Sequence, residues 1–294
     1  MKIGMTVEPV KGVPIKQLLM LLRIVGLDHF EVNTTMMERV DEFANCLKKT
    51  PTTFHLPFYD RFHFDMGTTN EEYKERIEEI IVFLNDYKQQ LNLKYVLTHP
   101  PEDPDSTSDT LIERLDRINC PIIIENIMEQ SDEDFMEFYF EVKKKLRNKI
   151  VGHAIDGPHR YVTNNETWLQ IPEKLLKEIV YVHISDCTKK ADLHLPLGCA
   201  KLPFNDFFDK LKEINFDGVI LQEIIPSLDQ TINVLDSILH SVKPFSKRQY
   251  LALKLRYTFL KPLTQLKIKS TFRQLRKSGN MLIQDLAYDL GLQH

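Results

Sequence analysis

Five of the ten histidines in this 294-residue chain share a position: each ends, or closely follows, a short apolar run. They are His55, His99, His159, His183 and His194. Four carboxylates occupy equivalent places, and these are Glu125, Asp156, Asp192 and Glu223. Mixed imidazole and carboxylate ligands suit Zn²⁺, Mn²⁺, Fe²⁺ or Co²⁺ better than Mg²⁺ or Ca²⁺. The pattern therefore predicts a divalent-metal centre, with zinc as the favoured ion and manganese, iron or cobalt as alternatives.

The complete set indicates metal binding more strongly than any single member does. One histidine at a strand end is more often a hydrogen-bonded structural residue than a ligand. Glu125 is harder to explain in that way, because it follows four consecutive apolar residues and burying an unpaired carboxylate is costly. Nine ligands are too many for one ion. With bridging carboxylates they suit two or three ions per chain, roughly 3.5–4 Å apart.

Strands and helices must alternate to bring these side chains together. Eight apolar, β-rich runs are expected to be strands, at residues 2–7, 29–33, 52–57, 94–99, 121–126, 151–156, 179–185 and 218–224. Helical spacing lies between them, at residues 15–25, 37–49, 71–91, 132–146, 204–214 and 228–242. Near-continuous apolar strands that alternate with amphipathic helices indicate a parallel sheet buried on both faces. Eight such units predict a (β/α)8 TIM barrel with the metal centre at its carboxyl-terminal rim, whereas an open doubly wound sheet would not gather these strand ends.

Charge divides the chain into two parts. Residues 245–294 contain ten Lys/Arg and two Asp/Glu, about +8, which leaves 28 basic and 40 acidic residues in 1–244, about −12. We therefore expect a metal-binding catalytic barrel over 1–244 and a basic, helical extension over 245–294. Two helical stretches are predicted in the extension, at 247–261 and 270–291. They are expected to pack on the barrel or on a partner subunit, which would allow an oligomer.

Other features indicate a cytoplasmic protein without a membrane partner. The four cysteines are scattered and form no CxxC pair, which is typical of a reducing compartment. The most apolar stretch, residues 18–27, is short and contains Arg23, so it predicts a packed helix rather than a membrane span. The acidic barrel is a poor electrostatic match for duplex DNA, so a nucleic-acid partner is possible but not favoured.

Over residues 1–242, the order of these motifs resembles the xylose-isomerase-like barrel superfamily, which includes endonuclease IV (AP endonuclease family 2) and many sugar isomerases and epimerases. The resemblance to endonuclease IV implies a three-zinc cluster held by all nine residues named above. The resemblance to single-metal epimerases implies ligands at Glu125, Asp156, His183 and Glu223 only, with the two glutamates also moving protons. His55, His99 and His194 would then be surplus.

The amino-acid sequences of these motifs differ from those of endonuclease IV in several places. This chain has THPPED, DGPH and DLHLPLGCAKLPF, and its DxHLPLG phrase is closer to sugar phosphate isomerase/epimerase relatives. We also expect Asn126 and Asp186 to orient Glu125 and His183.

Two enzyme functions follow, together with a non-enzymatic alternative. The first is a multinuclear, endonuclease IV-like hydrolase that acts on a small phosphoester. The second is a metal-dependent sugar or sugar-phosphate isomerase or epimerase, in which Glu125 and Glu223 are the catalytic residues that exchange a proton at a carbon next to a carbonyl. The third is a metal-binding barrel that uses its basic tail for docking. Fold-level analogy cannot separate the first two, because this architecture hosts both chemistries.

Overall fold

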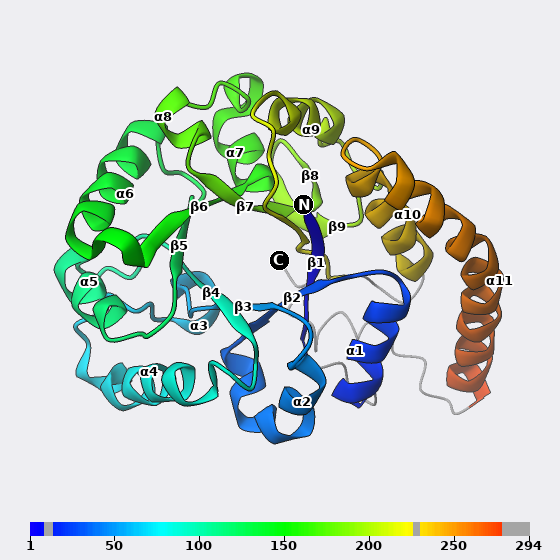
Figure 1. Cartoon of the computed structure of the whole chain (residues 1–294), viewed down its shortest axis with the longest axis horizontal. Coiled ribbons are helices and arrows are strands. Elements are labelled where there is room, and N and C mark those ends of the chain that lie inside the picture. Colours follow the sequence, from blue (N-terminus) through cyan, green and yellow to red (C-terminus); the bar gives the residue numbers. More distant parts are fainter. Residues whose placement is uncertain (9–13, 226–229, 278–294) are drawn as a thin grey trace.

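The computed structural model describes residues 1–8, 14–225 and 230–277. Eight parallel strands close into a barrel, in the order β1-β10-β7-β6-β5-β4-β3-β2 (Figure 1). The barrel strands are β1 (Lys2–Thr6), β2 (His29–Asn33), β3 (Thr52–His55), β4 (Leu93–Thr98), β5 (Ile122–Glu125), β6 (Ile150–Asp156), β7 (Ile179–Ile184) and β10 (Val219–Gln222). Each coincides with one of the eight predicted runs, so the predicted TIM barrel is confirmed.

Helices form a ring outside the strands (Figure 1). They are α1 (Ile15–Ile24), α2 (Val40–Leu47), α3 (Tyr59–Phe62), α4 (Lys74–Tyr87), α5 (Ser108–Asp116), α6 (Asp132–Leu146), α7 (Gly157–Asn164), α8 (Glu173–Leu176), α9 (Phe204–Glu213) and α10 (Thr231–Val242). The longest of them, α6, illustrates their construction. Ser131 caps it by accepting a hydrogen bond from the Asp134 amide, and three lysines in its last turn complement the helix dipole.

The core has two layers, which explains the continuous apolar strands. The larger layer fills the space between the strands and the helices. The smaller one lies inside the barrel and consists of Leu97, Ile123, Ala154, Tyr181, Val219 and Leu221. Because strand side chains alternate between these layers, both faces of each strand are apolar until the strand reaches the rim.

A two-stranded antiparallel hairpin, β8 (Asp186–Thr188) and β9 (Ala191–Leu195), interrupts the alternation after β7. The sequence predicted only a loop there. The carboxylate of Asp186 accepts four hydrogen bonds. They come from the backbone amides of Cys187, Gly198, Ala200 and Leu202. The prediction that Asp186 orients His183 is therefore wrong: its buried carboxylate ties together the hairpin and the loop that follows.

The described part of the extension, up to residue 277, forms one helix, α11 (Lys247–Lys277), where parts of two stretches were predicted. It continues through Pro262, and residues 278–291 of the second predicted stretch lie outside the described residues. The hydroxyl of Tyr257 donates to the carbonyl of Val25, just after α1, and Lys261 pairs with Asp236 of α10. Thus α11 packs against both neighbouring helices. Within the described residues, no helix is long and apolar enough to cross a membrane.

Candidate metal centre

All nine predicted ligands lie around the carboxyl-terminal rim of the barrel. Six come from barrel strands or the residue that follows one: His55 (β3), His99 (after β4), Glu125 (β5), Asp156 (β6), His183 (β7) and Glu223 (after β10). The other three come from α7 and the hairpin: His159, Asp192 and His194. The barrel therefore brings together residues that are up to 168 positions apart in the sequence.

Eight of the nine residues form three overlapping groups of potential ligands. The groups are His55, His99 and Glu125; Glu125, Asp156, His183 and Glu223; and Asp156, His159 and Asp192. The ligand atoms of each group lie within 4.8 Å of one another. Glu125 and Asp156 each belong to two groups, which is the arrangement that bridging carboxylates require. His194 belongs to none of them, although its Nε2 lies 3.6 Å from Oδ2 of Asp192.

His183 is oriented by a carboxylate that the sequence analysis did not identify. Its Nε2 donates to Oε2 of Glu31 on β2, 2.9 Å away, and the Tyr181 hydroxyl donates to the same oxygen at 3.1 Å. The other ring nitrogen, Nδ1, lies 2.7 Å from Oε1 of Glu125 and 3.3 Å from Oε2 of Glu223. The hydrogen bond to Glu31 thus fixes the tautomer that directs a lone pair from Nδ1 at the centre.

The other four histidines repeat this arrangement with the ring reversed. Nδ1 of His55 donates to the Leu56 carbonyl at 2.8 Å, that of His159 to the Asn126 carbonyl at 3.0 Å, and that of His194 to the Glu223 carbonyl at 3.3 Å. Nδ1 of His99 contacts the carboxylate of Glu102. In every case Nε2 faces a carboxylate of the set.

Two buried carboxylate oxygens, Oδ2 of Asp156 and Oδ2 of Asp192, make no hydrogen bond within the described part of the chain, and Nδ1 of His183 has only its ion-pair contacts with the neighbouring carboxylates. Burying such atoms without a partner is costly. All three belong to the groups described above, and a divalent ion would satisfy them. The donor set, its tautomers and these buried atoms therefore fit a bound metal.

Burial and neighbouring charges shift the pKa values of three side chains of the cluster in the metal-free protein. Burial and the neighbouring carboxylates, led by that of Glu125, raise the pKa of Asp156 well above its ordinary range. Burial lowers the pKa of His183, but the carboxylates of Glu125 and Glu31 outweigh it and raise that pKa well above its ordinary value. Burial also opposes protonation of His99, yet hydrogen bonds to neighbouring carboxylates raise its pKa to about 10. Protons therefore compete with a metal ion for these three side chains.

Asn126 has a different role from the predicted one. Its Oδ1 accepts from the Asp156 amide at 2.9 Å, and its Nδ2 donates to the Asp156 carbonyl at 3.3 Å. Its carbonyl also accepts from His159, as described above. Asn126 therefore positions Asp156 and His159 rather than Glu125. The missed residue, Glu31, carried a signal: like Glu125, it is a carboxylate within an apolar run (HFEVN).

Comparisons with known proteins agree with this architecture. The chain is 28% identical over 213 residues to the uncharacterised protein MJ1614 of Methanocaldococcus jannaschii, which covers 64% of this chain and 77% of that protein. The fold of this chain is similar to that of the 3-keto-D-glucoside 4-epimerase YcjR of E. coli. The TM-score is 0.61 at 18% identity, over 83% of this chain and 99% of that one.

An AP endonuclease of family 2 from Brucella melitensis is equally similar in fold. The TM-score is 0.62 at 14% identity, over 84% of this chain and 100% of the other. At such identities the two solved structures show the fold alone. The family model that matches residues 21–239, about three-quarters of the chain, describes the xylose isomerase-like TIM barrel. The chain therefore belongs to the xylose isomerase-like TIM-barrel family.

Proposed function

We propose that this protein is a divalent-metal-dependent phosphoester hydrolase with a multinuclear centre. The observation that carries the proposal is the overlap of the three ligand groups through Glu125 and Asp156. A centre built for one ion has no need of the group formed by His55, His99 and Glu125. Hydrolysis of a phosphoester is a reaction for which closely spaced ions are well suited.

Eight residues would hold the ions, and His194 would complete the set beside Asp192. Bound divalent cations would neutralise charge on a phosphoryl group and lower the pKa of water towards neutrality. The protein's own contribution is orientation: each of the five imidazoles forms a hydrogen bond through one ring nitrogen and turns the other towards the ligand groups, and two carboxylates are shared between neighbouring groups. The imidazole-rich donor set favours zinc over magnesium or calcium.

A positively charged side chain, that of Arg61, also lies at the carboxyl-terminal end of the barrel. Arg61 of α3 pairs with Glu8, and Nδ2 of Asn33 donates to the same carboxylate at 3.0 Å. Burial opposes the charge on Arg61, but Glu8 and the more distant Glu223 outweigh it and raise its pKa. We infer that Arg61 contacts the anionic part of a small phosphoester substrate.

A sugar or sugar-phosphate isomerase or epimerase is the second candidate, and one observation favours it. Glu125, Asp156, His183 and Glu223 form a complete single-metal group without the other residues. Glu125 and Glu223 would then exchange the proton at a carbon next to a carbonyl. However, burial raises the pKa of each glutamate and His183 more than offsets this, so both pKa values are lowered. This favours the ionised form of each glutamate, which can bind a metal or accept a proton from the substrate.

The two candidates are separated by testing one preparation for both reactions. The metal-loaded full chain is assayed with phosphomonoester and phosphodiester model substrates, and with a panel of ketoses in deuterated water. The hydrolase predicts phosphoester cleavage that His55→Gln reduces strongly, while the matched change His240→Gln, outside the centre, leaves it unchanged. Deuterium incorporation into a ketose that persists in His55→Gln, without phosphoester cleavage, would replace the hydrolase by the isomerase. Metal binding without either reaction would favour the non-enzymatic alternative.

A further inference from the structure

Most of the exposed large apolar side chains gather on two neighbouring helices. Of the twelve such side chains among the described residues, eight lie on α1 or α11, and each is between 43% and 69% exposed. They are Met20, Leu21, Ile24, Leu251, Leu255, Phe259, Leu263 and Leu266. The helices touch: a guanidinium nitrogen of Arg256 donates to the Ile24 carbonyl at 3.0 Å. Concentration of exposed apolar groups on one side of a protein marks an interaction surface.

The helix α11 is apolar on two opposite sides. Leu253 and Tyr257 are buried against the barrel helices. Five exposed side chains, from Leu251 to Leu266, recur every three or four residues and so follow one outward face. A helix with two apolar faces is expected to be covered on both. The inward face is covered by α1 and α10, whereas the outward face is open to solvent in this structure.

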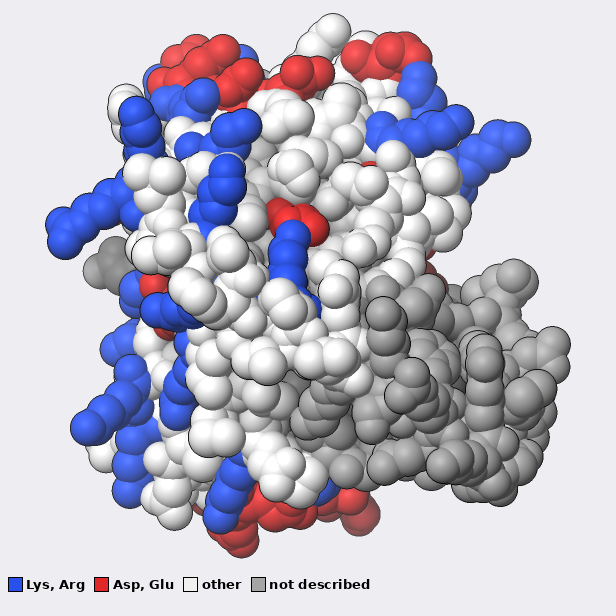
Figure 2. Space-filling view, turned by 90° about the vertical axis from the view of Figure 1, so that its right-hand side faces the viewer, with Lys and Arg blue, Asp and Glu red and all other residues white. Residues whose placement is uncertain are grey.

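The charge on this side restricts what can cover it. Neither α1 nor α11 contains a single Asp or Glu, while α11 contains ten Lys/Arg and α1 contains Lys16 and Arg23. Figure 2 shows this side of the molecule, with Lys and Arg gathered on the left and in the upper part of the view and most of the acidic side chains near its upper and lower edges. A second copy related by two-fold symmetry would place these basic helices against each other. An anionic surface is the complementary occupant.

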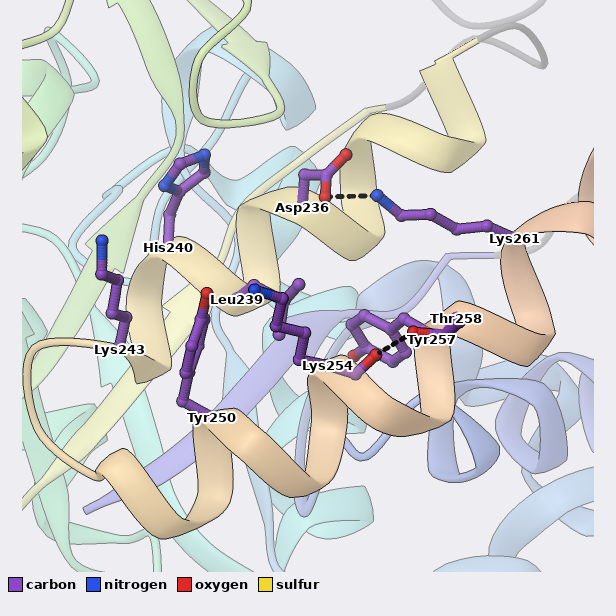
Figure 3. A pocket seen from close by; sticks show the side chains of 9 residues that line it. All are labelled: Asp236, Leu239, His240, Lys243, Tyr250, Lys254, Tyr257, Thr258 and Lys261. Carbon is purple, nitrogen blue, oxygen red and sulfur yellow. Dashed lines mark hydrogen bonds and ion pairs between the residues drawn. The ribbon is translucent and has the colours of Figure 1, made fainter.

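A basic cleft of about 300 Å³ adjoins the apolar face, between α10 and α11 (Figure 3). It is lined by Lys243, Lys254 and Lys261, together with Tyr250. Asp236 is its acidic member and is already paired with Lys261. Among the described residues, Lys243 and Lys254 have no ion-pair partner. Because Lys254 precedes Leu255 directly in α11, unpaired positive charge borders the exposed apolar face.

We propose that the face formed by α1 and α11 docks on an anionic phospholipid surface. Its Leu, Ile, Met and Phe side chains would enter the interfacial layer, while the flanking Lys and Arg, including those of the cleft, would contact lipid phosphates. The protein would lie on the membrane rather than cross it. This departs from the expectation from sequence that the protein has no membrane partner, and it does not depend on the proposed hydrolase activity.

Vesicle flotation of the full chain tests the proposal. Vesicles of phosphatidylcholine are compared with vesicles in which about a third of the lipid is phosphatidylserine, at low and at high salt. We expect the protein to bind the anionic vesicles at least about tenfold more tightly than vesicles of phosphatidylcholine alone. This binding should weaken as the salt concentration rises. The double variant Leu255→Asp with Phe259→Asp should lose at least about tenfold in binding. Lys254→Glu should weaken it by several-fold.

Matched variants on other helices serve as controls. Val82 of α4 is 55% exposed, so Val82→Asp repeats the apolar-to-acidic change away from the face and should leave binding unchanged. Lys144→Glu on α6 does the same for the charge reversal. Circular dichroism and metal content confirm that each variant keeps the barrel. The proposal is overturned if the wild-type protein does not bind anionic vesicles, or if the double variant binds them as well as the wild type does. It is also overturned if the protein forms a dimer in solution that the double variant abolishes.

Discussion

The candidate centre contains two kinds of ligand that differ in what holds them. His55, Glu125, Asp156 and His183 are barrel-strand residues, and with His99 they are between 0% and 8% exposed. Their positions follow from the closed hydrogen-bonded ladder of eight strands. Asp192 and His194 come instead from the two-stranded hairpin β8–β9, which packs over the rim.

His194 is less enclosed than the strand residues, whereas the side chain of Asp192 in the same hairpin is only 5% exposed. The His194 side chain is 30% exposed, and its backbone has a left-handed conformation with φ 46°. A positive φ is uncommon for a residue with a side chain and stores strain. A two-stranded hairpin is only marginally stable by itself. We therefore infer that the strand ligands form a preorganised part of the centre, whereas His194 is an adaptable ligand at its edge.

The largest effect is expected where two strand-borne groups meet. Glu125→Gln removes the carboxylate shared by the group of His55 and the group of His183, and leaves an amide that binds cations poorly. Hydrolysis should fall by about 10³-fold or more, with loss of bound metal. Steady-state kinetics and elemental analysis on the same sample measure both. Retention of full metal content in this variant would show that the carboxylate does not bridge.

A smaller effect is expected from the carboxylate behind His183. Glu31→Gln weakens the hydrogen bond that fixes the imidazole tautomer without touching a metal site, so metal affinity should fall by about 10–100-fold. Tyr181→Phe removes only the second hydrogen bond to the same oxygen and should cost less. Competition with a chromogenic chelator gives both affinities. Equal effects of the two variants would contradict the proposed role of Glu31.

Acid should weaken metal binding at the strand-borne ligands. The pKa values of His183, His99 and Asp156 are raised in the metal-free protein, so protons compete with the metal for these groups up to a higher pH than usual. Affinity should therefore rise with pH, by up to about tenfold per unit for each proton released. Calorimetry in two buffers of different ionisation enthalpy counts the protons. Binding without proton release would mean that the metal does not reach these groups.

The smallest effect is expected at the hairpin. His194→Ala should lower metal content by at most one ion per chain, with a loss of affinity several-fold smaller than that of Glu31→Gln, because the strand ligands are untouched. Elemental analysis after dialysis against a weak chelator measures this. If His194→Ala instead empties the whole centre, the distinction between the two kinds of ligand is wrong.

The sequence predicted much of this arrangement because a barrel repeats one simple unit. Each strand is buried on both faces until its carboxyl end, so a His, Asp or Glu that ends an apolar run, such as Glu125 or Asp156, stands out. The features that were missed depend on tertiary context. Glu31 lies in the middle of its apolar run, and only the packing of β2 opposite β7 shows that it reaches His183.

Two other features also could not be read from local patterns. The hairpin residues Asp186–Leu195 are partly polar and have no continuous apolar run, so their pairing depends on the rim beneath them. Residues 247–266 have apolar positions on both sides of the helix, and the spacing alone does not say which side meets the barrel. The structure shows that Leu253 faces inward and Leu255 outward, which turns a predicted packing helix into an exposed surface.

The metal content of the purified full chain tests the central claim most directly. Elemental analysis by mass spectrometry, combined with protein quantification, gives the number of ions per chain in wild type and in His55→Gln. A multinuclear centre predicts two or three ions per wild-type chain and at least one fewer in the variant. One ion or fewer in wild type, unchanged by His55→Gln, would contradict the account.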